Sequence, residues 1–364
     1  MRLSNPSKEI IRPCKEWTKS FERFNFKAIV IGATFICAST SLLAQTKSFE
    51  FLNLPGNATL SALGGVNVSA VNQNVNFFQS NPALTSDTTN GWGSASYLFY
   101  FANIGMGNFS YQPSLRRASG GKHKFEGGAL SFGIQHLALG QIEGYDATGV
   151  ATGKFNSGET ALFIGKSHRI NNFRLGANLK GAFSNVAGYR ANAVMLDLGG
   201  VFIHPHQDLS IGLVIKNLGF LLTEYSETSS TTLPFDIQAG ISFKPEHMPV
   251  RFSFTAHHLT SPDILYNNST FESEKPTTLD KVLAHFNLGA EVLVHKNARL
   301  LVGYNFLEHQ ELKLETTGGG SGFSIGVLAR VKSMEISFSR TGYVTSGSYQ
   351  VSLSANLEKI VTGT

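Results

Sequence analysis

Apolar and polar residues alternate along a stretch near the end of the chain, residues 349–357 (YQVSLSANL). The odd-numbered positions, from Tyr349 to Leu357, are apolar, and the even-numbered positions are polar and mostly small. Because successive side chains of a β-strand point to opposite faces, this pattern predicts a strand with one apolar and one polar face. Such a strand suits a soluble sandwich, which buries the apolar face, and a membrane barrel, whose apolar face contacts lipid.

The same alternation recurs in fourteen segments and predicts an all-β protein. The segments span residues 92–100, 104–112, 126–137, 159–168, 173–183, 194–204, 209–217, 235–243, 250–258, 285–294, 299–306, 322–330, 334–341 and 347–357. No run of about 20 apolar residues follows residue 44, so the pattern predicts no membrane-spanning helix there.

The connections between these segments favour the membrane barrel. Long and short connections alternate from the third segment onward. The long ones are residues 138–158, 184–193, 218–234, 259–284 and 307–321, and the short ones are 169–172, 205–208, 244–249, 295–298 and 331–333. Outer-membrane barrels have short periplasmic turns and longer outer loops, whereas a sandwich has no reason to keep this alternation. We therefore expect a 14-stranded transmembrane antiparallel β-barrel over residues 92–357, followed by a periplasmic tail at 358–364.

In such a barrel the apolar face of each strand lies in lipid and the polar face lines the lumen. We expect lipid contact for Val351, Leu353, Ile336, Phe338, Val292 and Ile241. The alternating residues between them, such as Ser352 and Gln238, would face inward.

Residues 45–91 do not fit the strand series, because they are small, polar and rich in Gly and Asn. Fourteen strands enclose a lumen that side chains of the wall alone do not fill. We therefore expect residues 45–91 to form an N-terminal hatch inside the barrel.

The first 44 residues have the composition of a secretory signal peptide. A basic stretch precedes the apolar core at residues 28–38 (AIVIGATFICA), and Leu42 and Ala44 stand three and one positions before the expected cleavage site. We expect cleavage between Ala44 and Gln45. Cys37 is a poor candidate for a lipoprotein cysteine, because Ile36 stands where a small residue is expected.

Removal of this segment changes the charge and the cysteine content of the protein. Residues 1–44 hold seven of the 30 Lys and Arg residues and three of the 25 Asp and Glu residues, so the remainder carries about +1. The basic character that would favour nucleic acid is therefore confined to the leader. Cys14 and Cys37 are also lost, which excludes disulfides and thiol chemistry from the mature chain.

Several residue clusters invite a chemical interpretation that their spacing does not support. His204 with His206 and His257 with His258 are metal candidates, but the first pair lies in a short turn and the second points to opposite faces of a strand. The segment GGGSGFS (318–324) lacks the Gly-Lys-Ser/Thr ending of a phosphate-binding loop. We expect no metal site, no catalytic residues and no cofactor.

Two carboxylates have basic neighbours on adjacent predicted strands. Glu291 faces Arg299, and Arg330 faces Glu335, each across a short turn. We expect lumenal or rim ion pairs here in preference to catalytic dyads. A barrel hydrolase would need a Ser–His–carboxylate set, and no spacing singles one out.

Three stretches carry a resemblance to a known family. The stretch LGGVNVS…FFQSNPAL (63–84), which contains Asn81, Pro82 and Ala83, resembles the N-terminal hatch of FadL-like fourteen-stranded barrels. Together with this stretch, residues 144–259 and 285–343 resemble the PorQ family. The members of that family are outer-membrane components of the type IX secretion system of the Bacteroidetes. The resemblance implies that Asn81, Pro82 and Ala83 form a turn of the hatch.

Membership of this family implies a non-enzymatic role in the outer membrane. The implied partners are the PorU-like, PorV-like and PorZ-like proteins of the cell-surface attachment complex, in which the barrel helps to hold the PorZ-like protein. The candidate partner surface is the outer mouth, chiefly the connection 259–284, with 218–234 and 307–321 beside it. The connection 259–284 combines Leu265, Tyr266 and Phe271 with acidic residues. Two alternatives stay open: a FadL-like channel for hydrophobic compounds, which requires an apolar pocket and a lateral gap in the wall, and an outer-membrane lipid hydrolase.

Overall fold

The computed structural model describes residues 46–71, 74–114, 128–146, 148–226, 231–265, 276–312, 320–344 and 346–362. Residues Thr46–Thr364 form one compact unit. The predicted signal peptide, with the Ala44–Gln45 junction and Cys37, lies outside the described residues.

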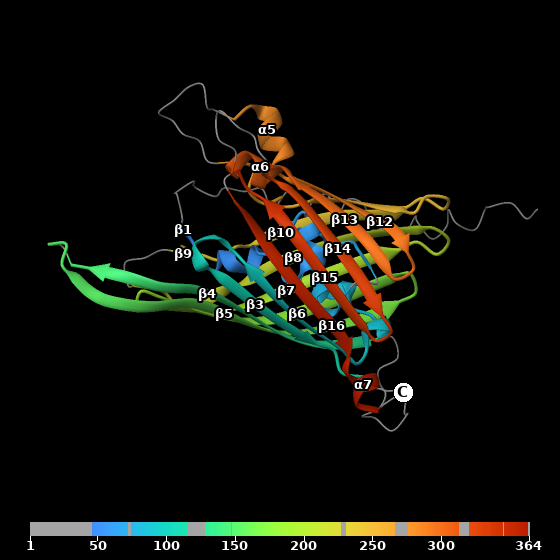
Figure 1. Ribbon diagram of the computed structural model, residues 1–364, viewed down its shortest axis with the longest axis horizontal. Helices are drawn as coiled ribbons and strands as arrows, with labels where there is room; N and C mark the ends of the chain where they lie inside the picture. The colour runs from blue at the N-terminus through green and yellow to red at the C-terminus, as the bar shows by residue number, and fades with distance from the viewer. Residues whose placement is uncertain are drawn as a thin grey trace, which may run out of the picture. The chain divides into compact units, whose positions relative to one another are not determined.

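Fourteen antiparallel strands close into a single barrel (Figure 1). They are β2 (Trp92–Phe99), β3 (Gly105–Tyr111), β4 (Gly128–Tyr145), β5 (Ala151–Ile170), β6 (Phe173–Val186), β7 (Tyr189–Ile203), β8 (Asp208–Thr223), β10 (Asp236–Lys244), β11 (Val250–Ala256), β12 (Phe286–His295), β13 (Ala298–Asn305), β14 (Phe323–Val331), β15 (Met334–Gly342) and β16 (Gly347–Asn356). Each strand pairs with its neighbours in sequence, and β16 pairs with β2 to close the ring. The predicted number of strands and the predicted fold class are confirmed.

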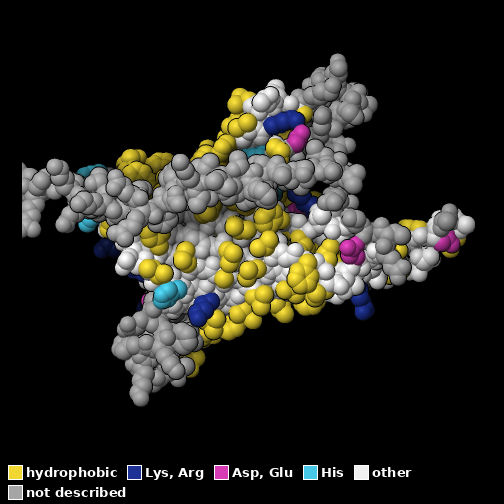
Figure 2. Space-filling model, turned by 180° about the vertical axis from the view of Figure 1, so that it is seen from behind, with side chains coloured by type: hydrophobic (Ala, Val, Ile, Leu, Met, Phe, Trp, Pro, Cys, Tyr) yellow, Lys and Arg dark blue, Asp and Glu magenta, His cyan; other side chains and the backbone are white. Residues whose placement is uncertain are grey.

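One face of each strand is exposed and the other is buried, as the alternation of apolar and polar residues predicts. On β15 and β16, Ile336 pairs with Leu353, and these side chains are 52% and 46% exposed. Ser352, one position away from Leu353, is 1% exposed and faces the lumen. Apolar side chains cover much of the wall in Figure 2, and charged ones gather toward its ends. A closed barrel with an apolar outer face and a polar inner face is the architecture of bacterial outer-membrane proteins, and the chain is therefore a Gram-negative outer-membrane β-barrel.

The two ends of the barrel differ in their connections. At one end the turns at 171–172, 204–207, 245–249, 296–297 and 332–333 are short, although the connection 112–127 is longer. The other end carries the longest connections, which contain α5 (Thr278–Leu283) and α6 (Phe306–Leu312). By the rule for outer-membrane barrels, the short turns mark the periplasmic end and the long connections the outer end. None of the described helices is long and apolar enough to cross a membrane.

Two of the expected outer loops are strands. β4 and β5 continue to Tyr145 and from Ala151, so most of 138–158 forms a hairpin that projects beyond the barrel (Figure 1). β6 and β7 are joined by Ala187 and Gly188 alone, both with positive φ, as a tight hairpin turn requires. The prediction of loops at 138–158 and 184–193 was wrong because a hairpin above the membrane has no lipid-facing side. Its strands therefore do not show the alternation of apolar and polar residues.

Residues 46–71 and 74–91 lie within the barrel and include several short turns of helix. They comprise η1 (Glu50–Asn53), α3 (Ala58–Ala62), η2 (Val75–Gln79), η3 (Pro82–Leu84) and η4 (Asp87–Thr89). The preceding β1 (Thr46–Lys47) pairs with β9 (Thr231–Thr232). The helix α3 packs against β13–β16, and η3 packs against β5–β7 on another side of the lumen. We call this segment the hatch. After β16 the chain forms α7 (Leu357–Thr362), where the sequence indicated only a tail.

Candidate functional site

The Asn81-Pro82-Ala83 triplet anchors the hatch to the wall. Asn81 is fully buried and caps η3, because its Oδ1 accepts a hydrogen bond from the Ala83 amide at 2.9 Å. Its Nδ2 donates to the Val68 carbonyl at 2.9 Å and, at 3.5 Å, to the carbonyl of Gly200 on β7. The triplet therefore joins two parts of the hatch to the barrel, and its polar atoms are occupied by these contacts.

A belt of glycines on the inner wall makes room for the hatch. A Cβ atom on Gly199 would overlap Asn81 Oδ1, and one on Gly303 would overlap the Gly64 backbone nitrogen. Further members of the belt that face hatch atoms are Gly133, Gly165, Gly176, Gly212, Gly240, Gly289 and Gly326. The backbone of the hatch thus approaches the backbone of the wall on many strands, which is possible only where the wall has no side chain.

Small polar side chains of the wall hold the hatch between these glycines. Ser352 Oγ accepts from the Ala58 amide at 2.8 Å, and Asn287 Nδ2 donates to the Leu63 carbonyl at 2.9 Å. On other strands, Asn178 Nδ2 donates to the Phe78 carbonyl at 2.7 Å, and Ser242 Oγ lies 2.8 Å from Ser69 Oγ. The polar faces of the strands therefore bind the hatch, as buried polar groups need partners.

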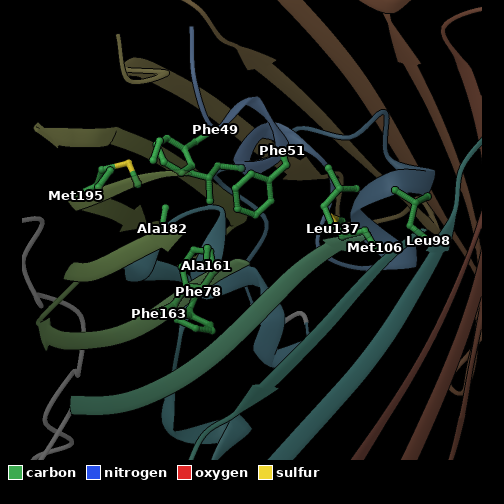
Figure 3. Close-up of a cluster of buried hydrophobic side chains, with 13 residues drawn as sticks. Phe49, Phe51, Phe78, Leu98, Met106, Leu137, Ala161, Phe163, Ala182 and Met195 are labelled. Atoms are coloured by element: carbon green, nitrogen blue, oxygen red, sulfur yellow. The ribbon is translucent and has the colours of Figure 1, made fainter. Parts of the chain in front are cut away.

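An apolar cluster lies in the lumen beside the hatch (Figure 3). Phe49 and Phe51 of the hatch segment meet inward-facing side chains of six strands. These wall residues are Leu98, Met106, Leu137, Ala161, Phe163, Ala182, Ala191, Ala193 and Met195. We expected mainly polar inward residues, and this part of the lumen corrects that expectation. The available signal was that both faces of β4–β7 become apolar there, which breaks the strict alternation.

A cavity of about 200 Å³ lies next to this cluster, between the hatch and the wall. Its apolar lining includes Leu52, Leu54 and Phe163, and its polar lining includes Lys216 and His257. It could accommodate a small ligand with an apolar body.

The His257–His258 pair lies at the edge of this cavity. The two residues follow β11, and His258 adopts a left-handed backbone (φ 55°) that brings its Nδ1 within 2.7 Å of His257 Nδ1. The expectation that the two rings point to opposite faces of a strand is therefore wrong. Burial, with His258 and His285 nearby, lowers the pKa of His257 to about 3, so its ring is neutral.

The two histidine pairs singled out in the sequence, His204 with His206 and His257 with His258, are not part of a metal centre formed by the described residues. His204 Nδ1 accepts hydrogen bonds from the amides of His206 and Gln207 at 3.2 and 3.0 Å, which closes the β7–β8 turn. Among the described residues, no three His, Cys, Asp or Glu side chains are grouped so that they could hold a metal ion.

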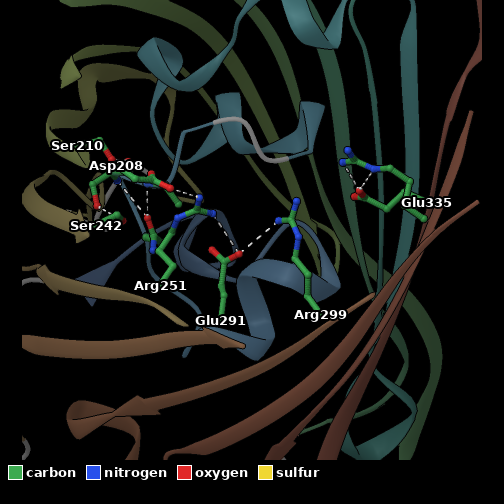
Figure 4. Close-up of polar contacts among 11 residues, drawn as sticks. Asp208, Ser210, Ser242, Arg251, Glu291, Arg299 and Glu335 are labelled. Carbon is green, nitrogen blue, oxygen red and sulfur yellow. Dashed lines mark hydrogen bonds and ion pairs between the residues drawn. The ribbon is translucent and has the colours of Figure 1, made fainter. Parts of the chain in front are cut away.

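Ion pairs cross-link the lumenal side of the wall near its periplasmic end (Figure 4). Glu291 accepts from Arg299 at 3.3 Å and from Arg251 at 3.5 Å, and Arg330 lies 2.5 Å from Glu335. Both predicted pairs are thus confirmed, and each joins adjacent strands. A third pair, Lys180 with Asp197 at 2.8 Å, is almost fully buried. Sequence reasoning missed it because only the barrel register brings β6 and β7 side chains together at this level.

The outer mouth carries the expected partner connection. Leu265 is buried, at 8% exposure, whereas Tyr266 and Phe271 lie outside the described residues. Instead, α5 exposes Leu279 and Val282 to solvent. The two helices are linked by a hydrogen bond from Gln310 Nε2 on α6 to Asp280 on α5 at 2.9 Å.

On α6, burial raises the pKa of Glu308 to about 7, and the nearby Glu311 adds to the effect. Glu308 also borders the cavity described above.

No protein-family model and no curated protein matches the sequence. Among solved structures, the Ralstonia pickettii toluene transporter TbuX is 12% identical and has a TM-score of 0.47, covering 84% of this chain and 98% of that one. A mutant of the TodX monoaromatic hydrocarbon channel is 12% identical, with a TM-score of 0.44 and coverages of 83% and 98%. A Pseudomonas aeruginosa FadL homologue is 10% identical, with a TM-score of 0.41 and coverages of 88% and 100%. These similar structures are outer-membrane barrels of the FadL type, and similarity at this level does not indicate a shared substrate.

Proposed function

We propose that the protein is a FadL-like outer-membrane channel for small hydrophobic compounds. The observation that carries this proposal is the apolar cluster in the lumen, which adjoins a cavity of about 200 Å³. The apolar wall residues pack against Phe49 and Phe51 of the hatch, and the cavity beside them has the lining of a ligand pocket, apolar with a few polar groups.

Passage through this channel requires the hatch to move. All fourteen strand pairs of the described barrel are closed, so the lateral gap that we expected of such a channel does not appear in this state. The hatch also fills the lumen between the cavity and the periplasmic end. A shift of the hatch would exchange its hydrogen bonds with the wall for hydrogen bonds with water, which costs little per bond.

A disulfide between hatch and wall tests this proposal. Ser69 Oγ and Ser242 Oγ are 2.8 Å apart, and the only natural cysteines are Cys14 and Cys37, outside the described residues. We expect the Ser69→Cys/Ser242→Cys variant to stop uptake of toluene, for which the similar TbuX is named, and reductant to restore it. The two single variants are the controls. Uptake that is unchanged in the oxidised double variant, or absent from the wild type, would refute the channel.

An alternative is that the barrel anchors partners of the type IX secretion system, as its resemblance to the PorQ family implies. Two observations favour this role. The seated hatch closes the lumen, and the outer end presents a platform of α5, α6 and the projecting β4–β5 hairpin (Figure 1). A rigid scaffold with surface-exposed loops is a common way to present a binding surface. The partners would be PorZ-like, PorU-like and PorV-like proteins.

Replacing residues 262–282 by a short Gly/Ser linker tests the anchoring role. We expect the barrel to stay in the outer membrane while a PorZ-like partner is released into the medium. Affinity purification from native membranes provides the readout. If the shortened barrel retains the same surface partners, this connection does not bind them, and if the wild type retains none, the anchoring role is wrong.

A further inference from the structure

The outer face of the wall changes from apolar to polar between two adjacent rows of side chains on β4–β7. In the lower row, Ile134, Leu162, Gly181 and Val194 lie side by side across the four strands. In the next row toward the outer end, the paired residues are His136, Thr160, Phe183 and Asn192. Positions two residues apart along a strand are about 7 Å apart, so this boundary is sharp. In a lipid-facing wall, such a change from apolar to polar side chains is expected where hydrocarbon gives way to lipid head groups.

A hollow of about 420 Å³ lies at this boundary on the outside of the barrel. It is lined by the polar row, by Asn185 and Arg190 of the row above it, and by Asn156 two residues farther along β5. Gly158 stands between Ala138 and Asn185 on the paired strands and adds no side chain to the hollow. Phe183 is half-exposed and lies at the lower edge of the hollow, where an interfacial aromatic residue is expected.

The groups around the hollow suit an anion that also carries hydroxyl groups. Arg190 is exposed and forms no ion pair with any of the residues that the structure describes. Three amides, of Asn156, Asn185 and Asn192, offer both donors and acceptors, and none of the lining residues is acidic. A guanidinium binds phosphate oxygens through paired, charge-assisted hydrogen bonds, and amides suit sugar hydroxyls.

We propose that this hollow binds the phosphorylated sugar head group of a glycolipid in the outer leaflet. The acyl chains of the lipid then lie along the apolar rows below, over Ile134, Leu162 and Val194. A soluble anion would use only the charge of Arg190, whereas a glycolipid uses the charge, the amides and the apolar rows together. Basic pockets at head-group level are a known means of lipid recognition. This site is independent of both functions proposed above, because it lies outside the lumen and away from the 259–284 connection.

Native mass spectrometry of the purified full-length barrel, with lipid A and dephosphorylated lipid A supplied together, tests the site. We expect lipid A to bind preferentially. Arg190→Gln should weaken its binding about tenfold or more, as the loss of a hydrogen bond to a charged group does. Asn185→Leu, which fills the hollow from an exposed position, should weaken binding while leaving Arg190 in place. Arg169→Gln removes an equal charge at the periplasmic end of β5 and should have no effect.

Three outcomes would overturn the proposal. Equal binding of the two lipids would show that phosphate is not recognised. An equal loss of lipid A binding in the Arg190→Gln and Arg169→Gln variants would show a general effect of charge. Displacement of lipid A by millimolar inorganic phosphate would show that the hollow is an anion site that does not recognise the lipid.

Discussion

At the scale of single residues, position relative to lipid decides what a substitution costs. Leu353 and Ser352 are neighbours in sequence, but one contacts lipid and the other accepts a hydrogen bond from the hatch. From sequence alone, an inward polar position such as Ser352 is expected to tolerate change. The structure shows that it does not, because Ser352 lies directly against α3.

Val351→Arg should lower the free energy of unfolding by about 2–4 kcal/mol, because Val351 pairs with Phe338 midway along β15 and the substitution places a charge in the lipid-facing band. Urea titration of the barrel in lipid vesicles measures the change. Val331→Arg, at the periplasmic end of β14, is the matched control and should cost about 0–1 kcal/mol. If both variants lost the same stability, the exposed apolar face would not be in lipid.

Gly199→Ala should lower the free energy of unfolding by about 1–3 kcal/mol, as overpacking does, because the new methyl group overlaps Asn81 and Pro82. Limited proteolysis should then cut the hatch faster than in the wild type. Gly107→Ala is the control, because a Cβ there meets nothing within 4 Å. A Gly199→Ala barrel with unchanged stability and an unchanged cleavage rate would contradict the close fit of the hatch.

At the scale of elements, the strands and the presence of a hatch followed from the sequence, whereas the turns within the hatch did not. Alternation located all fourteen strands, because lipid imposes the same two-residue period on every one of them. The turns of the hatch have no such period, since the wall surrounds them on every side. The sequence singled out Asn81, Pro82 and Ala83, but the hydrogen bonds of Asn81 to Val68 and Gly200 depend on tertiary contacts alone. The apolar cluster was missed for a related reason: Phe49 and Phe51 precede the first barrel strand by some 40 residues.

The helix α6 should loosen as the pH rises, because of Glu308. Its pKa rises from the ordinary 4.5 to about 7 in the folded protein, so the folded state holds a proton that the unfolded state has lost within this window. Stability contributed by that proton is full below pH 4.5 and falls as the pH rises toward 7.

Hydrogen-exchange protection of residues 306–312, corrected for the intrinsic exchange rate, should therefore be lower at pH 8 than at pH 5. Glu308→Gln should remove most of the difference, and Glu308→Gln/Glu311→Gln should remove the rest, because burial also raises the pKa of Glu311 on the same helix. Glu143→Gln, on the projecting hairpin, should leave the difference unchanged. A pH dependence that persists in full in Glu308→Gln would assign the effect to another group.

At the scale of the whole molecule, the protein is a barrel filled by its own N-terminal segment. The wall supplies glycines and small polar side chains, and the hatch supplies backbone groups and aromatic rings. Because the hatch occupies the lumen, the barrel differs from an open porin of similar size.

Deletion of residues 48–90 should convert the closed barrel into a water-filled pore. The inward polar side chains would then be hydrated instead of bonded to the hatch. Single-channel recordings in planar bilayers should show steady conductance for the deletion variant, and little for the wild type or the oxidised Ser69→Cys/Ser242→Cys variant. An inserted deletion variant that does not conduct would mean that the wall collapses without its hatch.

The glycine belt also constrains the order of assembly. The hatch precedes β2 in the chain, and the ring closes only when β16, the last strand, pairs with β2. Wall and hatch fit so closely that even a methyl group on Gly199 or Gly303 would overlap hatch atoms, so the folded hatch cannot thread into a finished cylinder. In the wild type, the strands therefore close around a hatch that is already in place. The pairing of β16 with β2 is then the step of biogenesis that traps the hatch inside the mature barrel.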